Sequence, residues 1–306
     1  IASLKDVLGD MTLTNLLIEE LDLSQINFNG NTLTLQCKQL NKIVGSETFN
    51  GSLFLLPKDC RLTELTLEGI SNIEGDFQCK DYFYVKEFVM PFIRVAGDMT
   101  IALNSGSVNT AAEIEFPKLL EIGGTLTLEN NKNANNITFP LLKKILGSCS
   151  VTTYKLKNDI EFTNLESIGT DGADAQIKFE IEATNILCPK LKTINGKFDI
   201  ATSSFMFDME VDKVSYPNVE SISENLSITC PYSDFGSNGI LSIDFSGLKS
   251  AKGISISGQG DVTDFSSFKY LFENNVLTGE SQWSVRECAY NPTYQDMKDG
   301  KYKPAE

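Results

Sequence analysis

The chain repeats one phrase, I-x-F-P-x-L-x-x-I-x-G-x-L-x-L, and this repetition constrains the fold more than any single residue does. One copy runs from Ile114 to Leu128, and the next runs from Ile137 to Val151. Between Ile70 and Leu248, successive L-x-x-I-x-G cores lie 22 to 29 residues apart. A period of this length is typical of solenoids, in which each repeat is one unit that stacks on the next. Further copies begin at Ile186 and Val214, and looser ones at Ile160 and Ile243.

The physical chemistry of the phrase predicts short parallel strands. In I-x-F and L-x-L, inward positions alternate with outward ones, as in a strand with one buried face. Pro ends the first strand because it lacks a backbone N–H, and Gly permits a corner that a Cβ would crowd. One coil cannot bury its apolar edge alone, whereas a stack of coils can. We therefore expect a mainly β, parallel β-solenoid of about ten coils over residues 1–272, with residues 273–306 as a C-terminal cap and tail.

Three local expectations follow from this register. The residues that share the aromatic position of the phrase should form one internal ladder. The segment from Leu16 to Leu23 has the one modest amphipathic helix pattern, and we expect it to cap the N-terminal end. The segment from Trp283 to Tyr294 should cover the other end of the stack, with ligand stacking on Trp283 as the alternative. The ladder residues are Phe116, Phe139, Phe162, Cys188, Tyr216 and Phe245.

Charge and composition exclude several function classes. The net charge is −15 and the basic residues form no cluster, so the sequence predicts no nucleic-acid partner. The chain has no histidine, which removes Ser-His and Cys-His pairs and imidazole metal ligands. No stretch approaches 18 consecutive apolar residues, so no membrane span is predicted. We expect Ile1 to be the start of a processed chain, with membrane attachment only through a lipid anchor upstream of it.

The seven cysteines divide into two groups. Cys79 and Cys149 occupy strand positions held elsewhere by Leu, Ile or Val, and Cys188 occupies the aromatic position. We expect these three to be reduced and buried, because free cysteine packs as a small hydrophobic residue. The repeat does not place the other four, and a disulfide framework among them stays open. No C-x-x-C pair occurs, so no metal site is predicted. The unplaced cysteines are Cys37, Cys60, Cys230 and Cys288.

Two groups of acidic residues leave an enzymatic function as an alternative. They are Asp171 with Asp174, and Asp208 with Glu210 and Asp212. Some parallel β-helices cleave polysaccharides with clustered carboxylates, but such enzymes fix their catalytic groups on strands. Both sets here fall in polar inserted segments, which favours solvated loop charge. The sequence therefore predicts no catalytic residues and no cofactor.

Repeat lengths predict where a ligand would bind. From the aromatic position to the second strand, every good copy spans 12 residues. Only the stretch after the second strand varies, with 9 residues from Leu128 to Ile137 and 15 from Ile228 to Ile243. All insertions should therefore emerge along one edge of the stack, and such an edge is often the binding face. Packing of the loop aromatic residues onto the solenoid is the alternative to ligand contact. The candidate ligand-binding residues in these loops are Phe205, Phe207, Tyr232 and Phe235.

The run Phe116-Pro117-Lys118-Leu119, continued by Ile122-Gly123-Gly124-Thr125-Leu126-Thr127-Leu128, resembles the receptor L-domain-like family of leucine-rich solenoids. That family includes the L domains of growth-factor and insulin receptors, fungal cell-wall proteins and surface proteins of gut Bacteroidetes. The resemblance implies a right-handed parallel β-helix outside the cell, over roughly residues 1 to 272. The tail from Tyr290 to Met297, with Gly300 to Tyr302, resembles endings of Bacteroidetes surface lipoproteins. Receptor L domains are disulfide-capped, and the core-position cysteines depart from that pattern.

These observations favour a non-catalytic extracellular binding or adhesion module at the cell surface. It would recognise a protein or a glycan along one solenoid edge, and the repeat motif does not identify which. One alternative is a carbohydrate-active β-helix enzyme, a lyase or hydrolase that uses acidic residues. The other is a structural envelope protein.

Overall fold

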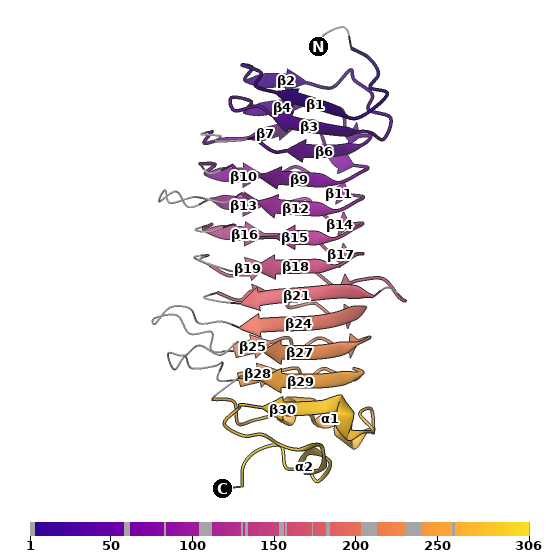
Figure 1. Cartoon of the computed structure of the whole chain (residues 1–306), viewed down its shortest axis with the longest axis vertical. Coiled ribbons are helices and arrows are strands. Elements are labelled where there is room, and N and C mark those ends of the chain that lie inside the picture. The colour runs from indigo at the N-terminus through magenta and orange to yellow at the C-terminus, as the bar shows by residue number, and fades with distance from the viewer. Residues whose placement is uncertain are drawn as a thin grey trace.

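The computed structural model confirms a mainly β fold built as a parallel β-solenoid (Figure 1). Strands make up 41% of the chain and helices 6%, and the stack has about 8 turns, slightly fewer than the ten expected. The structure describes residues 4–57, 62–82, 84–103, 112–129, 131, 134–152, 156, 158–172, 174–181, 184–202, 213–229, 240, 242–258 and 261–305.

One face of the solenoid is a 12-stranded sheet, which we call the long sheet. All of its strands run parallel, and each contributes one rung to the stack. In spatial order they are β1 (Met11–Thr14), β3 (Thr32–Gln36), β6 (Ser52–Leu55), β9 (Phe77–Lys80), β12 (Met99–Ala102), β15 (Leu126–Leu128), β18 (Cys149–Thr152), β21 (Ala175–Ile181), β24 (Gly196–Thr202), β27 (Asn225–Thr229), β29 (Gly253–Ser257) and β30 (Trp283–Arg286).

The other two faces are made of shorter strands. The second face is an eight-stranded sheet of two-residue strands: β5 (Thr48–Phe49), β8 (Asn72–Ile73), β11 (Arg94–Val95), β14 (Glu121–Ile122), β17 (Lys144–Ile145), β20 (Ser167–Ile168), β23 (Thr193–Ile194) and β26 (Ser221–Ile222). The third face holds three small sheets: β2 (Glu20–Asp22), β4 (Lys42–Val44) and β7 (Thr66–Glu68); β10 (Glu87–Val89), β13 (Glu113–Glu115), β16 (Asn136–Thr138), β19 (Ile160–Glu161) and β22 (Ile186–Leu187); and β25 (Lys213–Ser215) with β28 (Ser242–Asp244).

One copy of the phrase corresponds to one coil. Ile114 is in register with Ile137 on the third face, and Leu126 is in register with Cys149 on the long sheet. The alternating residues of each strand point inward in turn, so the core is a continuous column of buried Leu, Ile, Val and Phe. The strand alignment predicted from the repeat is therefore confirmed.

The glycine of the phrase sits at the corner before the long sheet, where successive coils touch. The backbone N–H of Gly124 donates to the carbonyl of Gly97 at 2.9 Å, and the N–H of Gly147 donates to the carbonyl of Gly124 at 3.0 Å. A Cβ built on Gly147 would lie 2.6 Å from the carbonyl carbon of Gly124. Such a contact is with backbone that cannot rotate away, so the close stacking of coils selects glycine here.

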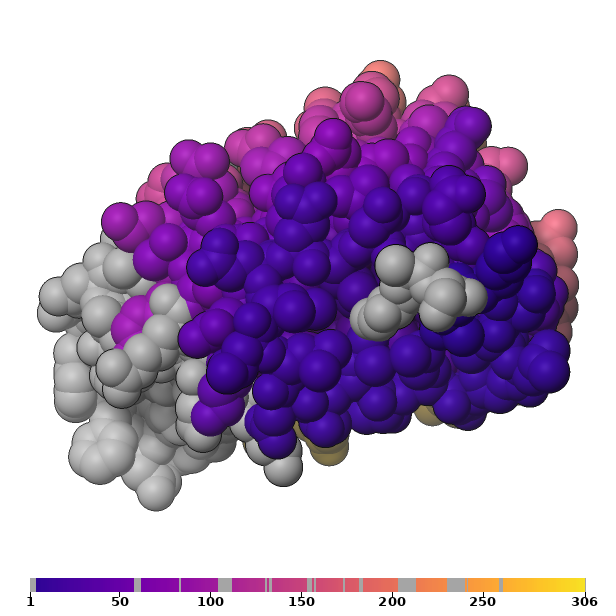
Figure 2. All heavy atoms as spheres, turned by 90° about the horizontal axis from the view of Figure 1, so that it is seen from above, coloured from indigo at the N-terminus to yellow at the C-terminus, as the bar shows by residue number. Residues whose placement is uncertain are grey.

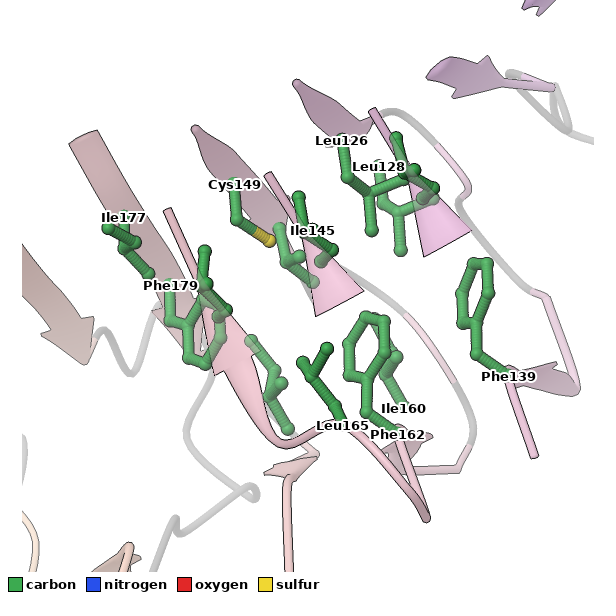
Figure 3. Close-up of a cluster of buried hydrophobic side chains, with 14 of the residues drawn as sticks. Leu126, Leu128, Phe139, Ile145, Cys149, Ile160, Phe162, Leu165, Ile177 and Phe179 are labelled. Atoms are coloured by element: carbon green, nitrogen blue, oxygen red, sulfur yellow. The ribbon is translucent and has the colours of Figure 1, made fainter. Parts of the chain in front are cut away.

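The six residues of the predicted aromatic ladder are all buried. Phe116 stacks on Phe139 with ring centroids 4.9 Å apart, and Phe139 stacks on Phe162 at the same distance. Figure 3 shows the last two rings among the inward aliphatic side chains. Cys188 carries no ring, so the stack is interrupted there and resumes with Tyr216 and Phe245, whose centroids are 5.7 Å apart. The expectation of a common internal column is confirmed, but its rings form two runs.

The cysteines expected in the core are buried. Cys79, Cys149 and Cys188 have exposed fractions of 0%, 0% and 6%, and Cys149 and Cys188 are free thiols. Burial in apolar surroundings raises the pKa of both of these thiols well above the ordinary value, because it disfavours the thiolate. Such thiols are packing groups rather than reactive ones.

The predicted helix from Leu16 to Leu23 is wrong. Glu20–Asp22 forms strand β2, which pairs in parallel with β4 and places Leu21 opposite Ile43. Leu21 is buried in this pairing, whereas Leu17 is 83% exposed. The apolar residues of this segment are spaced as in a short amphipathic helix, but the segment belongs to a coil. Stacking on the next coil buries more apolar surface than an isolated short helix would.

The C-terminal segment adds a last strand to the long sheet and packs on the end of the stack. Strand β30 pairs with β29, and the buried Trp283 ring packs against Phe268 and Phe272, with its indole N–H donating to the carbonyl of Pro292 at 2.9 Å. This burial leaves Trp283 as a packing residue of the cap. The remaining elements are η1 (Ser266–Phe268), α1 (Lys269–Glu273), η2 (Glu280–Gln282) and α2 (Tyr294–Lys298).

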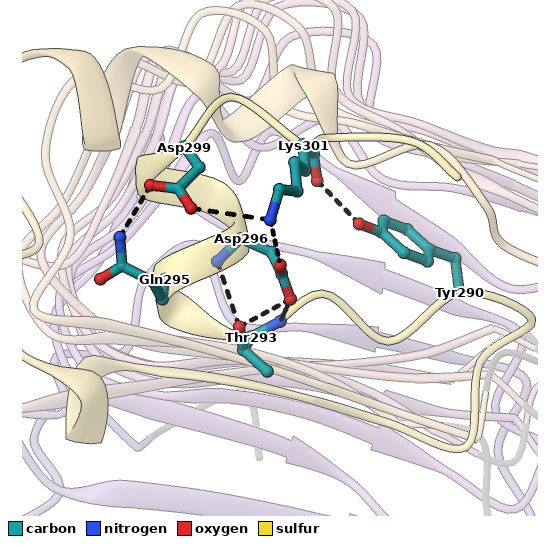
Figure 4. A network of polar contacts seen from close by, with 6 residues as sticks. All are labelled: Tyr290, Thr293, Gln295, Asp296, Asp299 and Lys301. Carbon is teal, nitrogen blue, oxygen red and sulfur yellow. Dashed lines mark hydrogen bonds and ion pairs between the residues drawn. The ribbon is translucent and has the colours of Figure 1, made fainter. Parts of the chain in front are cut away.

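Helix α2 is held by a compact polar network (Figure 4). The Thr293 hydroxyl accepts a hydrogen bond from the N–H of Asp296, and the Asp296 carboxylate accepts one from the N–H of Thr293, which is a reciprocal capping box. Lys301 contacts Asp296 and Asp299, and Tyr290 donates its hydroxyl to the carbonyl of Lys301. These contacts fold the tail onto itself, and the N–H of Phe265 ties it to the end of the stack by donating to the carbonyl of Tyr302 at 3.0 Å.

Candidate functional site

The candidate site is the edge at which strands of the long sheet end and the chain crosses to the third face, and we call it the loop edge. Crossings at this edge differ in length: β21 ends at Ile181 and β22 begins at Ile186, whereas β24 ends at Thr202 and β25 begins at Lys213. The longest runs from Thr229 to Ser242. In Figure 1 this edge lies to the left of the long sheet.

The corner between the second face and the long sheet is uniform by comparison. Strand β14 ends at Ile122 and β15 begins at Leu126, and the same spacing separates Ile145 from Cys149. One larger turn interrupts this regularity, between β20 and β21, where Asp171 and Asp174 lie. The strand order thus places the main length variation on one edge, as the repeat lengths predict.

The four aromatic residues proposed from the sequence as ligand contacts lie outside the described residues. Their flanking strands fix the edge to which they belong. Phe205 and Phe207 fall between β24 and β25, and Tyr232 and Phe235 fall between β27 and β28. Both crossings therefore start from the loop edge, on neighbouring coils.

A polar network lines the described part of the loop edge. The carboxylate of Glu113 accepts hydrogen bonds from the side-chain amides of Asn135 and Asn136, the second at 2.6 Å. On the next coil, the Asn158 amide donates to the carbonyl oxygen of Asn135 at 2.9 Å and to the Oδ1 of Asn136 at 3.2 Å. These side chains join three successive coils, and each lies where the chain enters the third face.

The network continues into the following coil. Asp159 is in the column of Asn136, and its Oδ1 accepts the backbone N–H of Asn185 at 2.6 Å. Thr184 lies in the column of Asn135 and Asn158, and its buried hydroxyl has no hydrogen-bond partner within the described part of the chain. Side-chain amides and carboxylates supply both donors and acceptors, which suits recognition of sugar hydroxyls or peptide groups.

The sequence pattern did not predict this network, because polar residues that precede a strand are usually interpreted as turn formers. A signal was present: Asn135-Asn136, Asn158-Asp159 and Asn185 all precede the I-x-F part of the phrase at the same phase. Residues at equal phase stack in a solenoid, so repeated Asn and Asp at one phase indicate a polar column.

The third face beside the loop edge is acidic with exposed apolar side chains between the charges. Its outward side chains include Glu87, Glu115 and Glu161. Val89 and Leu187 on the same face are 43% and 39% exposed. A surface of this kind repels polyanions and offers apolar contact to a neutral or basic partner.

A second polar contact lies on the long sheet close to the loop edge. Lys178 forms an ion pair with Glu180, and the Thr152 hydroxyl donates to the Oε2 of Glu180 at 2.8 Å. The hydrogen bond from Lys178 holds the pKa of Glu180 below its ordinary value, and the bond from Thr152 adds to this effect. The carboxylate is therefore ionised and held in one orientation at neutral pH.

The acidic sets considered for catalysis are not assembled into a site by the described residues. Asp171 and Asp174 are exposed on the turn between β20 and β21, away from the loop edge. Asp208, Glu210 and Asp212 lie outside the described residues. Across the described ranges, no group of three or more Cys, Asp or Glu side chains is arranged to hold a metal ion.

Helices in the described ranges are short, and none is long and apolar enough to cross a membrane. No family model, no curated protein and no solved structure matches the chain.

Proposed function

We propose that this protein is a non-catalytic binding or adhesion module of the cell surface, which recognises a protein or a glycan along the loop edge. The observation that carries the proposal is the concentration of length variation on that edge. Apart from the larger turn between β20 and β21, the other corners vary less in length, and the strands of the long sheet pair in parallel from β1 to β30. Loops held on a rigid scaffold are where binding residues concentrate, because they can vary without disturbing the core.

Side-chain chemistry at the loop edge supports binding. Two of the longer crossings carry Phe205, Phe207, Tyr232 and Phe235, whose rings can stack on sugars or anchor a protein partner. The described network of Glu113, Asn135, Asn136 and Asn158 lies on the same edge and supplies hydrogen-bonding groups. Aromatic anchors beside a fixed polar column are a common composition of binding surfaces.

Location outside the cell, with a lipid anchor upstream of Ile1, completes the proposal. It rests on the resemblance of the phrase to receptor L-domain-like solenoids and of the tail to surface lipoproteins. The acidic surface, with a net charge of −15, supports solubility of an exposed domain rather than contact with anionic lipid.

A binding screen tests the proposal. The protein is titrated against a glycan array and a panel of extracellular proteins, and in parallel against polysaccharides with detection of new reducing or unsaturated ends. Saturable binding without degradation is expected. Degradation of any polysaccharide would contradict a non-catalytic binding module and favour the alternative, a carbohydrate-active enzyme.

Variants then locate the site. With a ligand in hand, Phe205→Ala and Tyr232→Ala should each weaken binding at least about tenfold, as loss of a buried aromatic anchor does. Tyr270→Ala is the matched control, since Tyr270 is an aromatic residue 42% exposed in the C-terminal cap, away from the edge. Unchanged affinity with lowered stability in both loop variants would make these rings packing residues and move the site elsewhere.

A further inference from the structure

We propose that the outward face of the long sheet binds an extended, neutral, β-1,4-linked glycan, which lies across strands β3 to β18. This surface is separate from the loop edge. Figure 1 shows these strands stacked in order on the side turned toward the viewer, and Figure 2 looks down the same stack from its N-terminal end. A ligand that crosses the strands therefore runs along the length of the molecule.

One outward side chain of each strand belongs to a continuous column, which we call the neutral row. Parallel pairing places its successive members in register, from Thr34 opposite Phe54 to Thr127 opposite Ser150. Adjacent strands lie about 4.8 Å apart, so the row extends over about 24 Å. Its members are Thr34, Phe54, Gln78, Thr100, Thr127 and Ser150.

The row is uncharged, although the whole chain has a net charge of −15. Among the outward side chains of β3, β6, β9, β12, β15 and β18, all within the described ranges, Lys80 is the one that carries a charge. Charge begins in the column at β21, where Lys178 is in register with Ser150 and forms an ion pair with Glu180. A neutral ligand on the row therefore displaces water from hydroxyl and amide groups rather than from ions, which costs less free energy.

The polar side chains of the row are available to a ligand. Each is half-buried, and none forms a side-chain hydrogen bond with another residue in the described part of the chain. The neighbouring column differs, because Asp76 accepts the N–H of Asp98 at 2.8 Å and Asp98 accepts the N–H of Thr125 at 2.6 Å. Hydroxyls and side-chain amides both donate and accept hydrogen bonds, as sugar hydroxyls do.

Phe54 adds a ring to this row. Leu53 and Leu55 on either side of it in the strand are fully buried, so the Phe54 ring points outward. Across the strand residues described in the long sheet, it is the one outward aromatic side chain. Thr34 and Gln78 lie one strand away on its two sides. The C–H face of a pyranose can stack on such a ring while its hydroxyls bond to the polar neighbours.

The spacing of the row favours an extended linkage. Successive sugars of a β-1,4-linked chain lie nearly as far apart as adjacent strands, so each sugar would meet one member of the row, whereas an α-1,4-linked glucan coils away from a straight line. A protein partner fits less well, because the centre of a specific protein interface is apolar. Phe54 is the one large apolar side chain among the described outward residues of these strands.

The probes are cellohexaose, xylohexaose and mannohexaose, which are neutral and β-1,4-linked, with the α-1,4-linked maltohexaose as the control ligand. Calorimetric titration of the full chain should show saturable binding of at least one of the three and none of maltohexaose. Phe54→Ala and Phe54→Leu should each weaken binding at least about tenfold, because neither side chain presents a ring. Phe54→Tyr keeps the ring and should bind as the parent does.

A second pair of variants tests the polar part of the row. Gln78→Ala should weaken binding about threefold or more, because it removes a hydrogen-bonding group beside the stacked sugar. Ser255→Ala is the matched control, since Ser255 is an outward residue of β29, on the far side of the charged strand β21. It should bind as the parent does, and thermal unfolding verifies that all variants are folded.

Several outcomes overturn the proposal. They are no binding of the three β-1,4-linked probes up to millimolar concentration, equal binding of maltohexaose, and parent-like affinity of folded Phe54→Ala or Phe54→Leu. A protein ligand whose binding depends on Phe54 would also overturn it, by making a protein the occupant. Phe205→Ala and Tyr232→Ala should leave hexasaccharide binding unchanged, so failure here is separate from failure of the loop-edge site. Loss of hexasaccharide binding in those two variants would move the glycan to the loop edge.

Discussion

At the scale of single residues, the corner glycines are the positions at which the stack tolerates least change. A Cβ on Gly124 would lie 2.7 Å from the carbonyl carbon of Gly97, so Gly124→Ala forces two coils apart. We expect a loss of about 2 kcal/mol or more, although Gly→Ala in open backbone is usually stabilising. Urea unfolding followed by circular dichroism measures it. Gly9→Ala is the matched control, expected to change stability by less than about 1 kcal/mol.

Tyr216 is the one hydroxylated ring of the internal column. Its hydroxyl donates to the carbonyl oxygen of Ile186 at 3.0 Å, and no strand pairing joins β22 to β25 at this step. Tyr216→Phe should therefore cost about 1–2 kcal/mol, because it leaves a buried carbonyl without a donor. The exposed control Tyr270→Phe should stay within about 0.5 kcal/mol. Equal urea midpoints for parent and Tyr216→Phe would show that water replaces the hydroxyl.

At the scale of elements, the end of the stack determines whether the coils stay soluble. Deletion of residues 280–306 removes β30 and exposes the edge of β29 together with Phe268 and Phe272, which pack on Trp283. We expect a lower Tm and concentration-dependent aggregation, because the deletion uncovers the backbone edge of β29 and the apolar rings that pack on Trp283. Deletion of residues 303–306 removes only the exposed Lys303–Asp264 pair and should leave both properties unchanged. A parent-like Tm in the longer deletion would contradict a capping role.

At the scale of the whole molecule, acid should destabilise the fold. Hydrogen bonds from Ser24, Lys178, Lys249 and Thr293 lower the pKa of Asp22, Glu180, Glu220 and Asp296, respectively. A carboxyl group whose folded pKa is depressed contributes stability above its unfolded pKa and loses it as the pH falls through the folded value. We expect Tm to hold from pH 7 to pH 5 and to fall below about pH 4. A Tm that rises between pH 4 and pH 3 would show that relief of the acidic self-repulsion dominates.

The sequence by itself determined the coil, its register and its core. Equal phase in successive copies places Ile114 beside Ile137 and Phe116 on Phe139, since a one-residue slip would turn every inward side chain to solvent. It also determined the edge from which most insertions emerge, because the crossing from the long sheet to the third face varies most in length. The helix predicted from the apolar spacing of Leu16 to Leu23 was wrong, because part of this segment forms β2 and pairs with β4.

Only the tertiary structure decided which groups meet between coils. The joining of Glu113 to Asn135 and Asn136, and of Tyr216 to Ile186, depends on side-chain direction across the stack, which spacing along the chain does not specify. The same holds for Gly9. It has the same sequence pattern as the other corner glycines, and only the structure shows that a Cβ built on it would meet nothing within 4 Å among the described residues, because such contacts depend on neighbours in space rather than in sequence.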